Sequence, residues 1–465
     1  MTLIGSSSVR QVCEFLELTG LDRFVAASYG AQQKVTVKLE ESAIEFGQEE
    51  KSRLSQMMSP KEITVCQDET FHPETCLVSI EPDSNFLLLE KYAESRKASE
   101  WTKSMEDATQ GLKVTIVQST SDEGKGIVHH VKKDLGAHHG PDVFHVQHEI
   151  VKGTSAALSS KKKKAETILE KARQEVQRCI KEKEDYGNGK PGRGRPPEFD
   201  KRIEVSRQKE QQARQSFETA QSHQDRMKEA IQQIGDSYHP VDLETGKLKE
   251  AEEVSEALKR CFSQIEAVAC EAKLSESSLK RIQKAKKVVV DMVATIVFFH
   301  FTIRAKIEAL CLTANVERVV LENLIPAIYI SRVSRKAKCA GDRHRLRQKS
   351  EQLLLALRDE SSPFNELDKE EVELIEKVAE ECASLFQRSS SCVEGRNGQL
   401  SLRHHSLHRL SNRKLGALTV VHNYFIKRRD GTTAAERFFG AKPRELFEYL
   451  LKKIDLPGRP ARGRS

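Results

Sequence analysis

Three acidic residues stand where their carboxylates could meet. Asp68 lies at the end of the apolar stretch "KEITVCQDETF" (61–71), and Asp122 follows the strand-like run "KVTIVQS" (113–119), in a turn before a helix. If those two strands are neighbours, both side chains leave the same edge of a sheet. A third acid from a helix would then complete a site for two divalent cations about 3.5–4 Å apart, the arrangement that activates a water or a 3′-hydroxyl at a phosphodiester.

The third acid is chosen from a helical region rich in Glu. Glu394 differs from the others because it follows a run of serines that can cap a helix, in "SSSCVEGRNGQLSL" (389–402), and its neighbours are basic and polar. Three carboxylates are hard oxygen ligands, so they predict Mg²⁺, with Mn²⁺ able to substitute, rather than zinc. Singly, each acid could be an ordinary turn or strand-end residue.

The elements around the first two acids predict an α/β core. Short runs rich in β-branched and aromatic residues read as strands, separated by turns and short helices. Their order is strand, strand, strand, helix, strand, helix, strand, which indicates a mixed sheet with flanking helices. The expected strands are 63–71, 76–82, 85–92, 113–119 and 142–150, and the first helix is expected at 99–111 with Ser99 as its N-cap.

The chain divides into four regions by amino-acid composition and hydrophobic pattern. Residues 1–60 form an N-terminal helical segment, and 61–152 hold the first part of the core. Residues 153–387 are expected to be a long all-helical insertion, a charged antiparallel hairpin with a Gly/Pro-rich tip. Residues 388–465 complete the core and end in a basic tail.

Basic residues predict a polyanionic partner, with DNA the first candidate. From Arg396 to Ser465 there are 16 Lys and Arg against 5 Asp and Glu, on a chain whose net charge is only +7. The tip sequence "GRGRPP" is similar to an AT-hook core, whose arginines enter a narrow minor groove; the alternative is a flexible basic tip. The expected DNA-binding residues are Arg193, Arg195, Arg396, Asn397, Arg403, Lys427, Arg428 and Arg429.

Cysteine, histidine and apolar patterns bound the alternatives. The ten cysteines include no CxxC pair, which favours reduced thiols in a cytosolic protein. The longest apolar run, 288–301, is short for a membrane span and contains Asp291, so a buried helix is expected and no membrane partner. The histidines between 129 and 148 do not predict a zinc site, because His145 and His148 would point to opposite faces of the expected strand.

These pieces carry a family resemblance. "CQDETF", "VQSTSDEGKG" and "SSSCVEGRNGQLSLRHHSLHRLS" resemble the DDE motif of bacterial insertion-sequence transposases, which have an RNase H-like core. The tail "LTVVHNYFIKRRDGTTAAERFF" (418–439) resembles the C-terminal signature of such a family with an uncharacterised C-terminal domain. The resemblance implies that Asp68, Asp122 and Glu394 bind two Mg²⁺ and act on double-stranded DNA at the element ends and the target.

The resemblance also sets expectations that the residues alone do not. Such enzymes act as homo-oligomers on DNA, in the bacterial cytoplasm near the nucleoid. They usually carry an N-terminal helix-turn-helix domain, and the segment before the first strand holds no obvious basic recognition helix, so a shortened copy is expected. Two alternatives stay open: a degenerate transposase that keeps only nuclease activity or DNA binding, and a non-enzymatic helical DNA-binding protein.

Overall fold

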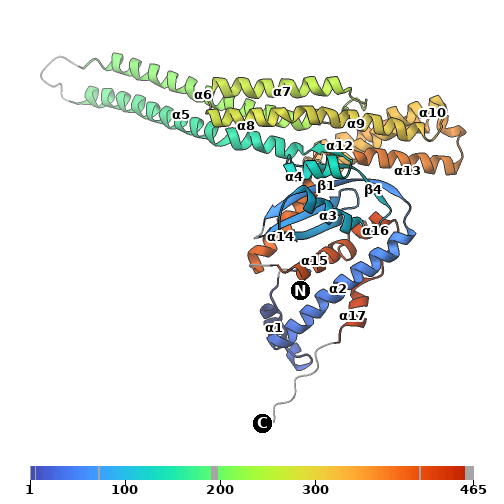
Figure 1. Cartoon of the computed structure of the whole chain (residues 1–465). Helices are drawn as coiled ribbons and strands as arrows, with labels where there is room; N and C mark the ends of the chain where they lie inside the picture. The colour runs from blue at the N-terminus through green and yellow to red at the C-terminus, as the bar shows by residue number, and fades with distance from the viewer. Residues whose placement is uncertain (1, 6, 72–73, 190–196, 408–409, 456–465) are drawn as a thin grey trace, which may run out of the picture. The chain divides into compact units, whose positions relative to one another are not determined.

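The computed structural model describes residues 2–5, 7–71, 74–189, 197–407 and 410–455 (Figure 1). They form two compact units. The sheet unit comprises Met1–Asp142, Leu243–Lys247 and Val297–Ser465, and the helical unit comprises Val143–Asp242 and Leu248–Ile296. The sequence placed the helical insertion at 153–387, whereas the sheet unit already resumes at Val297.

The sheet has five strands in the order β3-β2-β1-β4-β5. β1, β2 and β3 form an antiparallel meander, whereas β4 and β5 run parallel to β1. The prediction of a mixed sheet with flanking helices is therefore confirmed. The strands are β1 (Lys61–Phe71), β2 (Thr75–Glu81), β3 (Phe86–Ala93), β4 (Val114–Ser121) and β5 (His138–Pro141).

The fifth strand was predicted in the wrong place. It is the four-residue segment His138–Pro141, and residues 143–150 open the long helix α5 (Val143–Asn188) instead. The buried residues Val143, Val146 and Ile150 recur at helical spacing, which the sequence prediction read as strand alternation. His145 and His148 therefore lie on a helix. Two smaller differences are that α3 begins at Ala98, with Lys97 in the N-cap position, and that β1 begins at Lys61.

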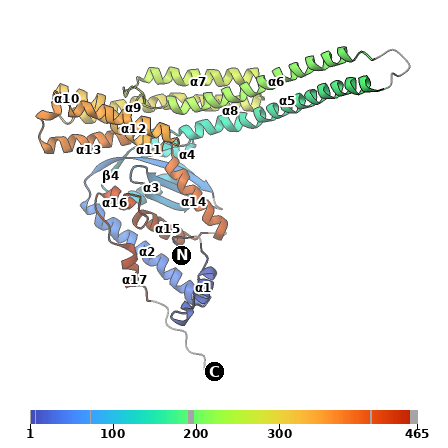
Figure 2. The same cartoon turned by 180° about the vertical axis from the view of Figure 1, so that it is seen from behind.

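The two faces of the sheet pack against different helices. Leu77 of β2 packs with Trp101 of α3 (Ala98–Thr109) and Ile127 of α4 (Lys125–His129), on what we call the α3 face. Its neighbour Val78 points the other way, because successive strand residues alternate. Val78 belongs to the larger core formed with α2 (Tyr29–Met57), α14 (Ser391–Leu407), α15 (Asn412–Tyr424) and α16 (Ala434–Phe439), on what we call the α14 face (Figure 2).

Shorter helices complete the sheet unit. Ser8 and Gln11 form a capping box at the start of α1, which fixes that N-terminus by two reciprocal hydrogen bonds. These elements are α1 (Val9–Leu18), η1 (Leu21–Arg23), η2 (His130–Asp134), α10 (Ala314–Val319), η3 (Val320–Leu324), α11 (Ile325–Lys336), α12 (Ala340–Arg358), η4 (Pro363–Glu366), α13 (Lys369–Leu385) and α17 (Leu446–Lys453).

The helical unit is built on two long paired helices. α5 and α6 (Phe199–Ser237) pair along their length, with α7 (Ala251–Glu271) and α8 (Glu276–Lys287) beside them. Buried Leu169 and Val176 of α5 and Ile203 and Ala213 of α6 supply its apolar seam, and charged residues cover the outside. The predicted tip arginines, Arg193 and Arg195, lie outside the described residues.

The apolar run near residue 290 belongs to α9 (Val289–Glu308). Together with α8 it makes Glu276–Glu308 long and apolar enough to cross a membrane, by length and composition only. A third of its most apolar stretch is buried inside the protein, so the helix that was expected to be buried is buried in part. A single helix of this kind is weak evidence for a membrane span.

Candidate metal site at the sheet edge

Asp68 lies on the central strand of the sheet and faces α14. In β1 its cross-strand partner is Val78 of β2, which lies on the α14 face. Its side chain is largely buried, with 8% of its surface exposed. One carboxylate oxygen accepts from the backbone N–H of Glu69 at 2.8 Å, and the other accepts from the side-chain amide of Asn397 at 2.9 Å. The carboxylate is therefore held in one orientation.

Glu394 lies in the first turn of α14, and the start of that helix is anchored. The backbone N–H of Glu394 donates to the carbonyl of Ser390 at 3.1 Å. Ser390 itself donates its N–H, at 2.9 Å, and its hydroxyl, at 2.5 Å, to one carboxylate oxygen of Asp142. Asp142 directly follows β5, so the start of α14 is fixed to the parallel edge of the sheet.

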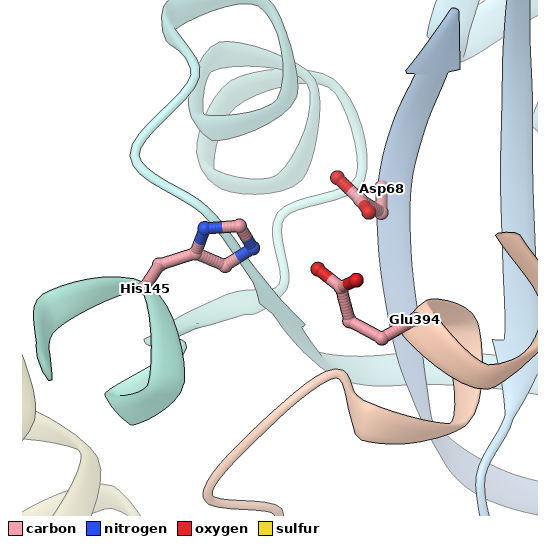
Figure 3. A group of neighbouring side chains, drawn as sticks. All are labelled: Asp68, His145 and Glu394. Carbon is pink, nitrogen blue, oxygen red and sulfur yellow. The ribbon is translucent and has the colours of Figure 1, made fainter. Parts of the chain in front are cut away.

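The structure brings Asp68 and Glu394 together from distant parts of the sequence. Each offers one carboxylate oxygen, and these two oxygens lie within 4.8 Å of one another. Figure 3 shows the two carboxylates turned toward each other, one from β1 and one from α14. His145, the third side chain drawn there, belongs to the first turn of α5 and thus to the helical unit, so the sheet unit itself supplies the two acids.

Asp122 follows β4 directly, as expected, but takes a different local role. The parallel register pairs Cys66 with Thr120, and continuing it by two positions sets Asp122 opposite Asp68. Its carboxylate accepts from the N–H of Gly124 at 3.0 Å, which ties it to its own turn. Among the described residues, Asp122 is not in the group of ligand atoms that contains Asp68 and Glu394.

Glu69 points to the opposite side of the sheet from Asp68. It accepts from the indole N–H of Trp101 at 3.1 Å and pairs with Arg96 at 3.2 Å. Burial raises the pKa of this carboxyl, and the nearby charge of Asp122 raises it further, against the effect of Trp101 and Arg96. The structure therefore holds Glu69 half-buried on the α3 face.

Two contacts fix the rotation of α14 about its axis. Asn397 donates to Asp68, and Arg396 donates through Nε and Nη2 to the two carboxylate oxygens of Glu90, each at 2.6 Å. The Glu90 side chain is fully buried and that of Arg396 is 5% exposed. Arg396 was predicted to contact DNA, and its burial in this ion pair argues against a direct phosphate contact.

The other predicted DNA-binding residues have mixed settings. Arg403 donates to the backbone carbonyls of Leu3 and Gly5, so the N-terminal segment engages it. Lys427, Arg428 and Arg429 are exposed and precede a turn in which Gly431 has a φ of +81°, as the Asp-Gly sequence predicted. Lys427 pairs with Glu445 at 3.6 Å, a solvent-exposed contact of small energy.

Three of the histidines between 129 and 148 are engaged inside the sheet unit. His130 and His139 are buried. His130 is within 2.9 Å of the Thr102 hydroxyl, and His139 of the Ser121 hydroxyl. His138 stacks on Phe298 with ring centroids 4.4 Å apart. These three rings are engaged in packing and hydrogen bonds on separate partners.

The donor set of the site fits a divalent cation. Two carboxylates with their oxygens this close repel each other unless a cation or a proton lies between them. Asn397 adds a second feature: its carbonyl oxygen is buried and has no hydrogen-bond partner in the described structure. Carboxylate and amide oxygens are the ligands of Mg²⁺ and Mn²⁺.

The comparisons with known proteins give one match. A family of unknown function, DUF6399, matches residues 320–465, just under a third of the chain. That region contains α14 with Glu394 and Asn397, whereas Asp68 and Asp122 lie outside it. No curated protein matches the chain.

Proposed function

We propose that this protein is a DDE-type transposase that cleaves DNA at the ends of an insertion sequence and joins them to a target. One observation carries the proposal: Asp68 on the central strand and Glu394 on a helix far along the sequence have carboxylate oxygens within 4.8 Å of one another. The sheet around them supports our proposal of an RNase H-like core, because three antiparallel strands are followed by two parallel ones in the order β3-β2-β1-β4-β5.

Asp68 and Glu394 are the residues we assign to the metal. When bound, Mg²⁺ or Mn²⁺ would supply the Lewis acidity that phosphodiester hydrolysis and transesterification need. The protein's own part is to orient the ligands. Asn397 holds one oxygen of Asp68, and the anchored first turn of α14 presents Glu394.

One residue is the candidate for a third ligand. Asp122 is the acid that the family resemblance assigns, and continuing the strand register sets it opposite Asp68.

The partners follow from the same proposal. The substrate is double-stranded DNA, both at the element ends and at the target, and paired ends imply a homo-oligomer on DNA. The location would be the bacterial cytoplasm, near the nucleoid. The test must distinguish this function from two alternatives, a nuclease without strand transfer and a DNA-binding protein without activity.

The test separates metal binding from chemistry. Calorimetric titration of Mn²⁺ into the full chain measures the affinity of the metal site directly. Cleavage and joining are measured on a DNA duplex that carries the sequence flanking the coding sequence. We expect Asp68→Asn and Glu394→Gln each to abolish both signals. Glu373→Gln, which alters an exposed acid of α13, is the matched control and should change neither.

A variant at the third position completes the test. Loss of Mn²⁺ binding in Asp122→Asn would assign Asp122 as the third ligand, and unchanged binding would remove it from the site. Cleavage without joining by the wild type would make the protein a nuclease. Unchanged Mn²⁺ binding and cleavage in Asp68→Asn and Glu394→Gln would refute the site.

A further inference from the structure

A second feature of the sheet unit is a basic pocket of about 250 Å³. Its apolar side contains Tyr329 of α11 and Phe386, two buried rings whose centroids lie 6.2 Å apart. Its polar side is made by five cationic side chains, Arg332, Arg335 and Lys336 of α11 together with Arg388 and Arg428. The sequence analysis singled out only Arg428 of these five.

The pocket carries a strong positive charge. Against its five cations stands one acid, Asp83. Asp83 pairs with Arg332 at 2.7 Å, and its backbone carbonyl accepts from Arg428 at 3.2 Å, so it also helps to hold two of the cations in place. The cations of the lining therefore outnumber its acid by four, and an anion inside the pocket would relieve the mutual repulsion of these side chains.

The local structure explains how the cations converge. Arg332, Arg335 and Lys336 are spaced i, i+3 and i+4, which places them on one face of α11. Arg335 and Lys336 lie in its last turn, where the helix dipole favours positive charge. Arg428 comes from the turn after α15, and Arg388 from the segment that follows α13.

That last segment connects the pocket to the candidate metal site. The side chains of Thr64 and Cys66 in β1 donate to the carbonyls of Leu385 and Ser389, and Thr120 of β4 donates to that of Gln387. The segment 385–389 is thus bound to the strands that lead to Asp68 and Asp122. Arg388 lines the pocket, and Glu394 follows it closely in the sequence, on α14.

The chemistry of the lining selects phosphate. Guanidinium groups bind phosphate oxygens through two parallel hydrogen bonds, and four of the five cations are arginines. Pockets for whole drug-sized ligands typically have volumes of about 300 Å³ or more. This pocket is smaller, so it suits one phosphate with its adjoining sugar. Exposed Arg335, Lys336 and Arg428 at its rim leave room for a chain that continues on either side.

We infer that this pocket binds a backbone phosphate of the same DNA that the acids act on, next to the phosphodiester to be cleaved. The inference rests on the proposed function for the identity of the ligand, but the binding itself needs no metal. The pocket would fix the register of the strand, while the carboxylates supply the metal site.

The experiment measures DNA binding by the full chain in EDTA, where no cleavage occurs. The probe is a short fluorescent DNA duplex, titrated at several salt concentrations by anisotropy. We expect Arg335→Gln/Lys336→Gln to weaken binding about tenfold and to lower the salt slope by about 1 to 2, since each lost phosphate contact removes about 0.9 from that slope. Lys369→Gln, which removes an exposed lysine of α13, is the matched control.

A second pair of measurements fixes the interpretation. Arg335 and Lys336 are exposed, so the double variant is expected to have the same unfolding midpoint as the control. Equal midpoints would show that its fold is intact. Pyrophosphate is then added as a competitor. Competition in the wild type, lost in the double variant, places the phosphate in the pocket.

The outcomes also separate this inference from the proposed function. If the double variant binds DNA more weakly but the wild type never cleaves DNA, the pocket is supported as a phosphate site and the transposase assignment is removed. Metal-dependent cleavage with DNA affinity and salt slope unchanged in the double variant overturns the pocket alone. A third outcome is that the wild type binds pyrophosphate tightly in the pocket while the double variant binds DNA as well as the wild type does. This outcome would overturn the assignment to a DNA backbone phosphate in favour of a small phosphorylated ligand.

Discussion

Replacing Arg396 by methionine tests whether the residue supports α14 or contacts DNA. Both of its donating nitrogens lie 2.6 Å from the carboxylate of Glu90, whose side chain is fully buried. The Thr419 hydroxyl, at 2.7 Å, would be the one remaining donor to that carboxylate among those identified in the structure. Breaking a buried pair by removing one partner costs about 3–5 kcal/mol, because the other charge stays buried. We expect the free energy of unfolding to fall by that amount at pH 7.

Urea unfolding followed by Trp101 fluorescence measures this loss of stability, since Trp101 is the only tryptophan and is buried in the same unit. Arg396→Met/Glu90→Leu should recover most of the loss, because an apolar pair leaves no buried charge. Lys453→Met, which removes an exposed pair with Glu45, should change stability far less. A fall in the free energy of unfolding of less than about 1 kcal/mol in Arg396→Met, the range of an exposed pair, would refute the buried ion pair. A reduced salt slope of DNA binding in a variant of equal stability would restore Arg396 as a phosphate contact.

Three further results are expected. Burial lowers the pKa of His130 to about 4, so wild type should lose up to about 3 kcal/mol of stability as pH falls from about 6.5 to 4. His130→Gln should lack this pH dependence in urea unfolding, and a variant with the same pH profile as wild type would contradict the prediction. Gly47→Ala should cost about 1–3 kcal/mol, because its Cβ would lie 2.5 Å from Val420, whereas Gly30→Ala in the same helix meets no atom within 4 Å and should be neutral or stabilising by thermal unfolding. Asn397→Ala should weaken Mn²⁺ binding about 10–100-fold by calorimetry, as loss of an orienting contact does; unchanged affinity would remove its orienting role.

The sheet could be predicted where the sequence has runs rich in β-branched and aromatic residues and could not where it lacks them. The three strands of the meander are such runs and end in turn residues, so their order followed from the sequence. β5 consists of two histidines, a glycine and a proline, a composition with no strand preference, and it is a strand because Ser121 and its neighbours pair with it. The apolar residues just after it misled the prediction, because the helical spacing of Val143, Val146 and Ile150 was taken for strand alternation over so short a window.

The candidate site could be predicted as a set of residue types but not as a geometry. An acid in a buried strand is costly without a partner, and Glu90 in "NFLLLEKY" carried that signal without being used. Its cation, Arg396, comes from a distant helix, which no local pattern reveals. The basic pocket was missed for the same reason: its cations come from three separate segments, and the composition shows only that the C-terminal region is basic.

The spacing of the α14 residues explains why this helix, among many that carry glutamates, presents the acid. Asp68, Val78 and Glu90 form one row across β1, β2 and β3 on the α14 face. Asn397 binds one end of that row and Arg396 the other, so adjacent residues of the helix hold both ends. Glu394 stands at position i−3 relative to Asn397 and so lies on the same side of α14. A helix held at Asp68 by Asn397 therefore directs Glu394 to Asp68 as well, and the short sequence "EGRN" contains the whole arrangement.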